Sequence, residues 1–130
     1  TDMHGVKIDR KFTDGLPELL IDGDQIRQVA INLILNAGAA MEDGGILTVK
    51  TYREEDDVVM TFADSGSGID EADLERIFEP FYTTKDRGTG LGLAITRQII
   101  EQHHGSIQMT SRTKQGTTVT IRLPLFREEF

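Results

Sequence analysis

The hydrophobic and polar residues of the chain follow two periods, which divide its first half into a strand and a helix. Residues 5–12 alternate between apolar and polar side chains, which predicts a half-buried strand. From Asp24 the apolar residues recur at steps of three and four, so residues 24–41 are predicted to form an amphipathic helix with Asp24 as its N-cap. The turn-forming residues 42–45 end that helix.

The second half of the chain predicts a hairpin, two further helices and a closing pair of strands. Residues 46–54 and 57–64 read as a β-hairpin, and residues 71–78 as a short helix. Residues 79–90 have no clean period and are predicted to form a long loop before a helix at 91–103 and strands at 105–111 and 116–125. This order predicts an α+β fold: a two-layer sandwich with a mixed, mainly antiparallel sheet and helices on one face.

Composition narrows the class of protein. The 130 residues suffice for a single domain, spanning 1–130 with ragged ends at about 1–4 and 127–130, and 38% hydrophobic residues with 13 glycines are ordinary for a globular protein. No segment has the length of a membrane span or the pattern of a signal peptide, and the absence of cysteine excludes disulfides and fits a cytoplasmic location. The net charge of −8 disfavours nucleic acid as a partner.

The stretch "TTKDRGTGLGLAI" places Gly88, Gly90 and Gly92 at alternate positions directly before a predicted helix. Glycine costs about 0.5–1 kcal/mol relative to alanine within a helix or strand, so three of them call for a reason. The N–H groups at a helix N-terminus attract phosphate, which makes an anion-binding loop one interpretation. A flexible structural connection is the other, because neither the Rossmann nor the P-loop glycine spacing fits.

Two other stretches carry candidate binding groups. In "DSGSGI", Asp64 ends an apolar strand, so its carboxylate either caps a turn in water or accepts a hydrogen bond from an amine such as that of adenine. In "NLILN", Asn32 and Asn36 lie one helical turn apart and on nearly the same line. Their amides either make structural hydrogen bonds to neighbouring backbone or supply oxygen to Mg²⁺.

Taken in order, "NLILN", "DSGSGI", "FEPFYTTK", "GTGLGLAI" and "GTTVTIRLP" resemble the ATP-binding catalytic domain of sensor histidine kinases. This domain belongs to the wider family of type II topoisomerases, heat-shock protein 90 chaperones and mismatch-repair ATPases, whose architecture is called the Bergerat fold. The resemblance covers residues 24–125, and "FEPFYTTK" is its most kinase-like part.

The resemblance implies a role for each matching residue. Asn36 would coordinate Mg²⁺ between the ATP phosphates, with Asn32 assisting, and Asp64 would bind the adenine amine, joined by Thr117 through a water. Asn32 and Lys85 would be the catalytic groups. Residues 79–90 would form a lid with Phe78, Phe81 and Tyr82 as apolar anchors. The further nucleotide contacts implied are Gly66, Gly68, Ile69, Phe81, Thr84, Arg87, Gly88, Thr89, Gly90, Leu91, Gly92 and Leu93.

One position separates the branches of this family. The ATPases, and the serine kinases that inactivate sigma factors, carry a glutamate four residues before the Mg²⁺ asparagine, whereas this chain has Asn32. A neutral amide cannot take a proton, so slow hydrolysis is expected. The resemblance then favours phosphoryl transfer to a histidine over an ATPase clamp, a serine kinase or a non-catalytic nucleotide-binding module.

The same resemblance implies the partners. The acceptor histidine would lie on a dimerisation domain absent from this sequence, within a homodimeric parent that is possibly membrane-anchored, and a response regulator would receive the phosphate. The three histidines present, His4, His103 and His104, are not expected to be phosphorylated.

Overall fold

The computed structural model describes residues 5–16, 21–82 and 92–125. Those residues form five strands and three helices. In chain order these are β1 (Val6–Phe12), α1 (Gly23–Ala40), β2 (Gly45–Glu54), β3 (Asp57–Asp64), α2 (Glu71–Leu74), α3 (Gly92–Gln102), β4 (Ser106–Arg112) and β5 (Gly116–Pro124).

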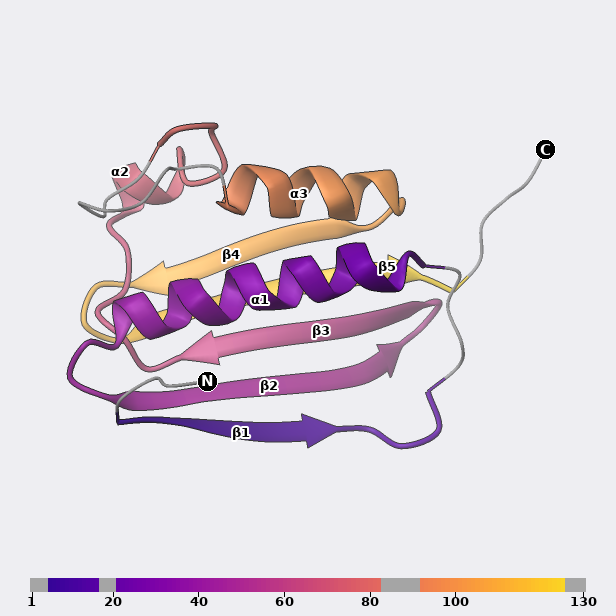
Figure 1. The fold of residues 1–130 in the computed structure, drawn as a ribbon, viewed down its shortest axis with the longest axis horizontal. Coiled ribbons are helices and arrows are strands. Elements are labelled where there is room, and N and C mark those ends of the chain that lie inside the picture. The colour runs from indigo at the N-terminus through magenta and orange to yellow at the C-terminus, as the bar shows by residue number, and fades with distance from the viewer. Residues whose placement is uncertain (1–4, 17–20, 83–91, 126–130) are drawn as a thin grey trace.

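The strands form one sheet in the order β1-β2-β3-β5-β4 (Figure 1). The first pair, β1 and β2, is parallel because α1 carries the chain back between them, and the other three pairs are antiparallel. The long helices α1 and α3 run side by side and pack against each other. The predicted α+β fold with a mixed, mainly antiparallel sheet is therefore confirmed.

One apolar layer joins the helices to the sheet. Val29, Leu33 and Ala37 repeat every fourth residue along α1 and are buried, as the period of the sequence predicts. They meet a cluster of buried strand and α3 residues: Leu47, Val49, Phe62, Ile99, Ile100, Val119, Ile121 and Leu123. Because these side chains come from one face of the sheet, the helices lie on that face, as expected. Among the described residues, no helix combines the length and hydropathy needed to cross a membrane.

The N-cap of α1 is Asp22 rather than the predicted Asp24. Its carboxylate accepts hydrogen bonds from the backbone N–H groups of Asp24 and Gln25 at 3.0 and 3.1 Å. Asp24 instead occupies the first turn of the helix, where its charge complements the helix dipole. The sequence places both aspartates around Gly23, and only the position of the first helical turn distinguishes them.

Helix α2 and strand β1 also differ from what the sequence predicts. Helix α2 is limited to Glu71–Leu74, shorter than the predicted 71–78, and turns follow it. Strand β1 is more exposed than predicted, since Ile8 and Phe12 are 38% and 55% exposed at the edge of the sheet. An edge strand has a neighbour on one side only, so alternation of its residues gives less burial than in a central strand.

The end of α3 is tied to the start of α1. His103 is buried, and its Nε2 accepts a hydrogen bond from the backbone N–H of Asp22 at 3.0 Å. Since that N–H only donates, Nδ1 carries the ring proton and donates it to the carbonyl oxygen of Ile99 at 2.8 Å. His104 follows with a left-handed φ of 63°, which turns the chain into β4.

Candidate functional site

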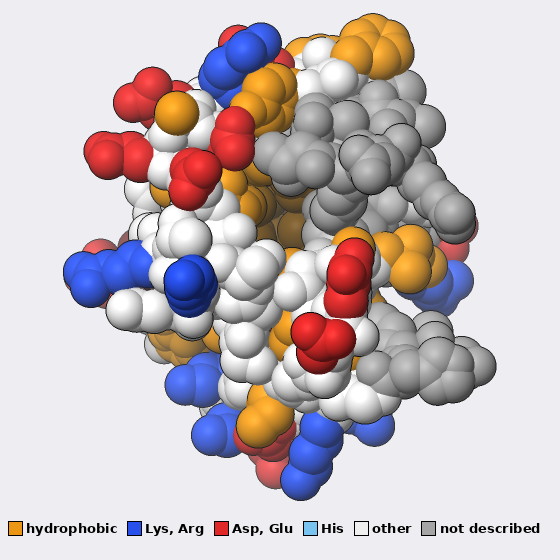
Figure 2. Space-filling model, turned by 90° about the vertical axis from the view of Figure 1, so that its left-hand side faces the viewer, with side chains coloured by type: hydrophobic (Ala, Val, Ile, Leu, Met, Phe, Trp, Pro, Cys, Tyr) orange, Lys and Arg blue, Asp and Glu red, His pale blue; other side chains and the backbone are white. Residues whose placement is uncertain are grey.

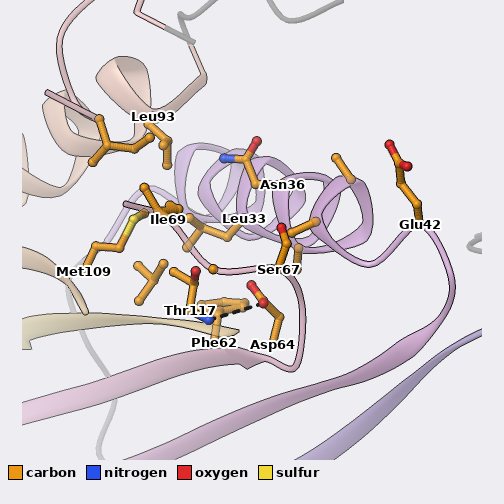
Figure 3. A pocket seen from close by; sticks show the side chains of 16 residues that line it. Leu33, Asn36, Glu42, Phe62, Asp64, Ser67, Ile69, Leu93, Met109 and Thr117 are labelled. Atoms are coloured by element: carbon orange, nitrogen blue, oxygen red, sulfur yellow. Dashed lines mark hydrogen bonds between the residues drawn. The ribbon is translucent and has the colours of Figure 1, made fainter. Parts of the chain in front are cut away.

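A cavity of about 610 Å³ opens where α1 and β3 end, a volume in the range of small-molecule sites. Figure 2 shows this end of the molecule hollowed, with hydrophobic side chains deep in the recess. The apolar lining comes from α1, β3, α3 and the last two strands: Leu33, Phe62, Leu93, Met109 and Val119, with Ile69 and Ile77 from the intervening segments. Polar side chains line it as well: Asn36, Glu42, Asp64, Ser67 and Thr117 (Figure 3).

Asp64 holds its carboxylate at the polar side of the cavity. Its Oδ1 accepts the backbone N–H of Gly66 at 2.9 Å and that of Thr117 at 3.3 Å. Residues 64 and 117 are direct partners in the β3–β5 register, so the sheet itself sets this contact. Asp64 and Thr117 are thus in direct contact through the Thr117 backbone, and the water-mediated link between them stays a prediction.

Asn36 reaches the same cavity from α1. Figure 3 shows Asn36 projecting from the helix on one side of the space and Asp64 from the sheet on the other. Glu42, two residues beyond the end of α1, adds a carboxylate to the lining. Glu42 belongs to the turn that the sequence predicts after the helix, and this turn brings it to the cavity.

Asn32 lies elsewhere, between the two long helices. Its Nδ2 donates to the carbonyl oxygen of Gly92 and to Oγ1 of Thr96, both at 3.3 Å, and its Oδ1 accepts from Gln28 at 2.9 Å. Asn32 is not among the described residues that line the cavity. The structural hydrogen bonds considered as one alternative for the asparagine pair are thus what Asn32 makes.

The loop after Asp64 is fixed by the β4–β5 hairpin. The Ser67 carbonyl accepts the N–H of Lys114 at 2.5 Å, and Ile69 N–H donates to Oγ of Ser111 at 2.8 Å. Gly68 has a φ of 77°, and a Cβ there would lie 2.0 Å from the carbonyl oxygen of Arg112. Only glycine fits this close approach. Gly68 and Ile69 line the cavity, whereas Gly66 is not among its described lining residues.

Ser111 is a residue that the sequence analysis missed. It lies on β4, beside the start of β5, and its hydroxyl contacts Ile69, Gly116 and Thr117 at once. A serine in an alternating strand carries no distinguishing signal in the sequence. Only the pairing of β4 with β5, which sets residue 111 opposite 117, could have identified it.

The segment from α2 to residue 82 bears the three expected anchors, Phe78, Phe81 and Tyr82. The Tyr82 hydroxyl donates to Asp73, and the Arg76 guanidinium lies 4.5 Å from the Tyr82 ring centre. The hydrogen bond to Asp73 raises the pKa of the Tyr82 phenol above its usual value, with smaller contributions from burial and the Asp73 charge. The Arg97 guanidinium carbon lies over the Phe78 ring, 5.7 Å from the ring centre. Phe81 is 73% exposed with a φ of 67°, and its role as an anchor and nucleotide contact stays a prediction.

The structure thus brings Asn36, Asp64, Gly68, Ile69, Leu93 and Thr117 together around one cavity. Gly92 begins α3, where its carbonyl oxygen accepts from Asn32, and it is not among the described residues that line the cavity. The remaining predicted contacts, Thr84, Lys85, Arg87, Gly88, Thr89, Gly90 and Leu91, lie outside the described residues. No group of three or more His, Cys, Asp or Glu side chains that could hold a metal is found within the described ranges.

Comparison with known proteins gives one consistent result. Residues 21–127 match the family described as histidine kinase-, DNA gyrase B-, and HSP90-like ATPase. Sensor histidine kinase ZraS of Escherichia coli is 42% identical over 126 residues, which cover 95% of this chain and 27% of that protein. The chain therefore spans about a quarter of the length of this relative.

Two solved structures agree with this match. The catalytic domain of histidine kinase ThkA, in a nucleotide-free form, has a TM-score of 0.83 and 32% identity, covering 95% of this chain and 82% of that one. Full-length ShkA in complex with AMPPNP has a TM-score of 0.84 and 28% identity, covering 95% of this chain and 26% of that one.

Proposed function

Since this chain belongs to the histidine kinase-, DNA gyrase B-, and HSP90-like ATPase family, we propose that it binds ATP with Mg²⁺ and transfers the γ-phosphoryl group to a histidine on a separate dimerisation domain. The similar protein ZraS is a sensor histidine kinase, which supports the kinase branch of the family. Because the chain spans only a quarter of ZraS, the acceptor domain, the homodimer and the response regulator belong to this proposal.

The observation that carries the proposal is the carboxylate of Asp64 in the cavity. Two backbone N–H groups donate to its Oδ1 and so fix the orientation of the side chain. A carboxylate accepts hydrogen bonds only, so it suits the exocyclic amine of adenine. The apolar walls formed by Ile69, Leu93 and Met109 provide surface for a flat base.

The phosphates would extend from the base toward Asn36. Its amide oxygen is the type of ligand that Mg²⁺ accepts beside nucleotide phosphates, and the metal would neutralise charge on the transferring group. One amide does not make a metal site, so most of the other ligands would be phosphate oxygens and water. The cationic contacts to the phosphates remain assigned to Lys85 and Arg87 by resemblance alone.

Asn32 supports transfer rather than hydrolysis. Its amide hydrogen-bonds at both ends, to Gln28 on one side and to Gly92 and Thr96 on the other. An amide cannot act as a general base for water, and this one is also occupied by helix–helix contacts. A histidine ring nitrogen already presents a lone pair, so a kinase acting on histidine needs no base at this position.

Two measurements test the proposal. Calorimetric titration of the chain with ATP and Mg²⁺ should give saturable 1:1 binding at about micromolar to millimolar Kd. Incubation with γ-labelled ATP and the parent protein's dimerisation domain should then give acid-labile, alkali-stable label on that domain, the property of phosphohistidine. Rapid phosphate release without label would instead identify an ATPase, and binding without either would identify a nucleotide-binding module.

A further inference from the structure

The hydroxyl of Ser111 sits at the meeting point of three segments beside the cavity. It lies 2.8 Å from the backbone N of Ile69, 3.0 Å from the carbonyl oxygen of Gly116 and 2.7 Å from Oγ1 of Thr117. Ile69 belongs to the loop after Asp64, and Gly116 and Thr117 begin β5. One side chain therefore contacts two of the residues that line the cavity.

The proton positions in this cluster follow from counting donors and acceptors. A hydroxyl has one proton to donate and two lone pairs. The Ile69 N–H can only donate, so one lone pair of Ser111 accepts it. The Gly116 carbonyl can only accept, so Ser111 donates its own proton to that oxygen. The remaining contact is satisfied only if Thr117 donates its proton to the second lone pair of Ser111.

This arrangement leaves Thr117 without a proton for the cavity. Thr117 is 7% exposed and lines the cavity beside Asp64 (Figure 3). With its proton directed to Ser111, its oxygen presents lone pairs, and the neighbouring carboxylate of Asp64 also presents lone pairs. The polar side of the cavity at these two residues is then built of acceptors.

We propose that Ser111 is a positioning residue that makes this part of the cavity select a purine with an amino group at position 6 over one with a carbonyl there. The proposal deepens, and rests on, the ATP-binding function proposed above. An amino group donates to Asp64 and to Thr117, directly or through a water. A carbonyl oxygen would face two acceptors, which leaves buried polar atoms unpaired and costs affinity.

The test compares ATP with inosine triphosphate, which carries a carbonyl at position 6, by measuring both Kd values for the 130-residue chain in Mg²⁺. Ser111→Ala frees the Thr117 proton, which can then be donated to the carbonyl. We expect the ratio of the Kd for inosine triphosphate to the Kd for ATP to fall about tenfold in this variant, which is the effect of one hydrogen bond. A merely structural role would weaken both nucleotides equally and leave the ratio unchanged.

Three variants complete the design. Ser111→Thr keeps the hydroxyl and should keep the wild-type ratio, as should Ser106→Ala, an exposed serine at the start of the same strand. Ser111→Cys fills the site with a weaker acceptor and should lower the ratio, which maintains the test if Ser111→Ala does not fold.

The outcomes separate this inference from the function on which it rests. If wild type binds ATP and Asp64→Asn weakens that binding, but neither Ser111→Ala nor Ser111→Cys changes the ratio by more than about twofold, the role of Ser111 is overturned and ATP binding stands. If wild type does not bind ATP, both are overturned. A ratio that falls in Ser111→Ala and returns in Ser111→Thr supports the proposal.

Discussion

The imidazole of His103 accepts the backbone N–H of Asp22 at 3.0 Å across 81 positions of the chain, joining the end of α3 to the N-cap of α1. His103→Leu should destabilise the fold by about 1–3 kcal/mol, because it removes the acceptor of a partly buried N–H. Urea unfolding measures the change. The adjacent Gln102→Leu is the control, since residue 102 is exposed and a change there should cost less than about 0.5 kcal/mol. Equal losses in the two variants would show that the hydrogen bond contributes nothing.

Asp64→Asn should raise the Kd for ATP by about 10–100-fold, since a hydrogen bond to a charged group contributes about 1.5–3 kcal/mol. Calorimetric titration measures the change. Asp57→Asn alters the first residue of the same strand, at the end remote from Asp64, and should leave the Kd near that of wild type. Unchanged affinity in Asp64→Asn would remove the basis for placing the base at this residue.

Asn36→Ala should weaken ATP binding more with Mg²⁺ than with EDTA, because the amide oxygen is proposed to act through the metal. The expected loss is about tenfold with Mg²⁺ and less than about threefold without it. Leu35→Ala, one residue earlier and 57% exposed, provides the control on the same helix. The same loss under both conditions would assign Asn36 to a direct contact or to the fold.

His104→Gly should stabilise the protein by up to about 1 kcal/mol, because residue 104 has a φ of 63° that glycine adopts without strain. The melting temperature should rise by roughly 3–5 °C. His104→Ala keeps the Cβ and the strain, so its melting temperature should stay close to that of wild type. A lower melting temperature for His104→Gly would mean that the imidazole makes a contact of greater value.

The Tyr82 phenol should titrate above its ordinary pKa of about 10, because its hydroxyl donates to Asp73. The folded-state pKa then exceeds the unfolded-state one, so the contact stabilises the fold below the unfolded-state pKa. This contribution is lost as the pH rises through the folded-state pKa. Absorbance at about 295 nm in a Tyr52→Phe background follows Tyr82 alone, since the chain has 2 tyrosines. Asp73→Ala should return the midpoint to the ordinary value; a midpoint that does not move would rule out the contact.

The elements with a strong period were predictable from the sequence. The apolar residues of α1 recur every third or fourth position, and the β2–β3 hairpin alternates around a charged turn, so both appear within a residue or two of their predicted bounds. The cavity was predictable in part for the same reason, since Asp64 and Asn36 lie at the ends of these elements.

What the sequence left undecided depends on contacts between distant segments. The parallel pairing of β1 with β2, the tie from Asn32 to Gly92 and the link from Ser111 to Thr117 all join residues whose relation appears only once the sheet is assembled. The choice of Asp22 over Asp24 as N-cap also follows from assembly, because His103 holds the backbone of Asp22 in place. Periodicity describes one segment at a time and contains no information on such pairs.

Gly68 and Gly116 fix how far this region can diversify. A Cβ at either position would lie 2.0 Å from a backbone carbonyl oxygen, that of Arg112 or of Asp64. In a saturation library, both positions should therefore reject every replacement, alanine included. Ser67, which is exposed and directly precedes Gly68, should accept many. Ligand preference here can evolve through exchange of side chains around an invariant main-chain path.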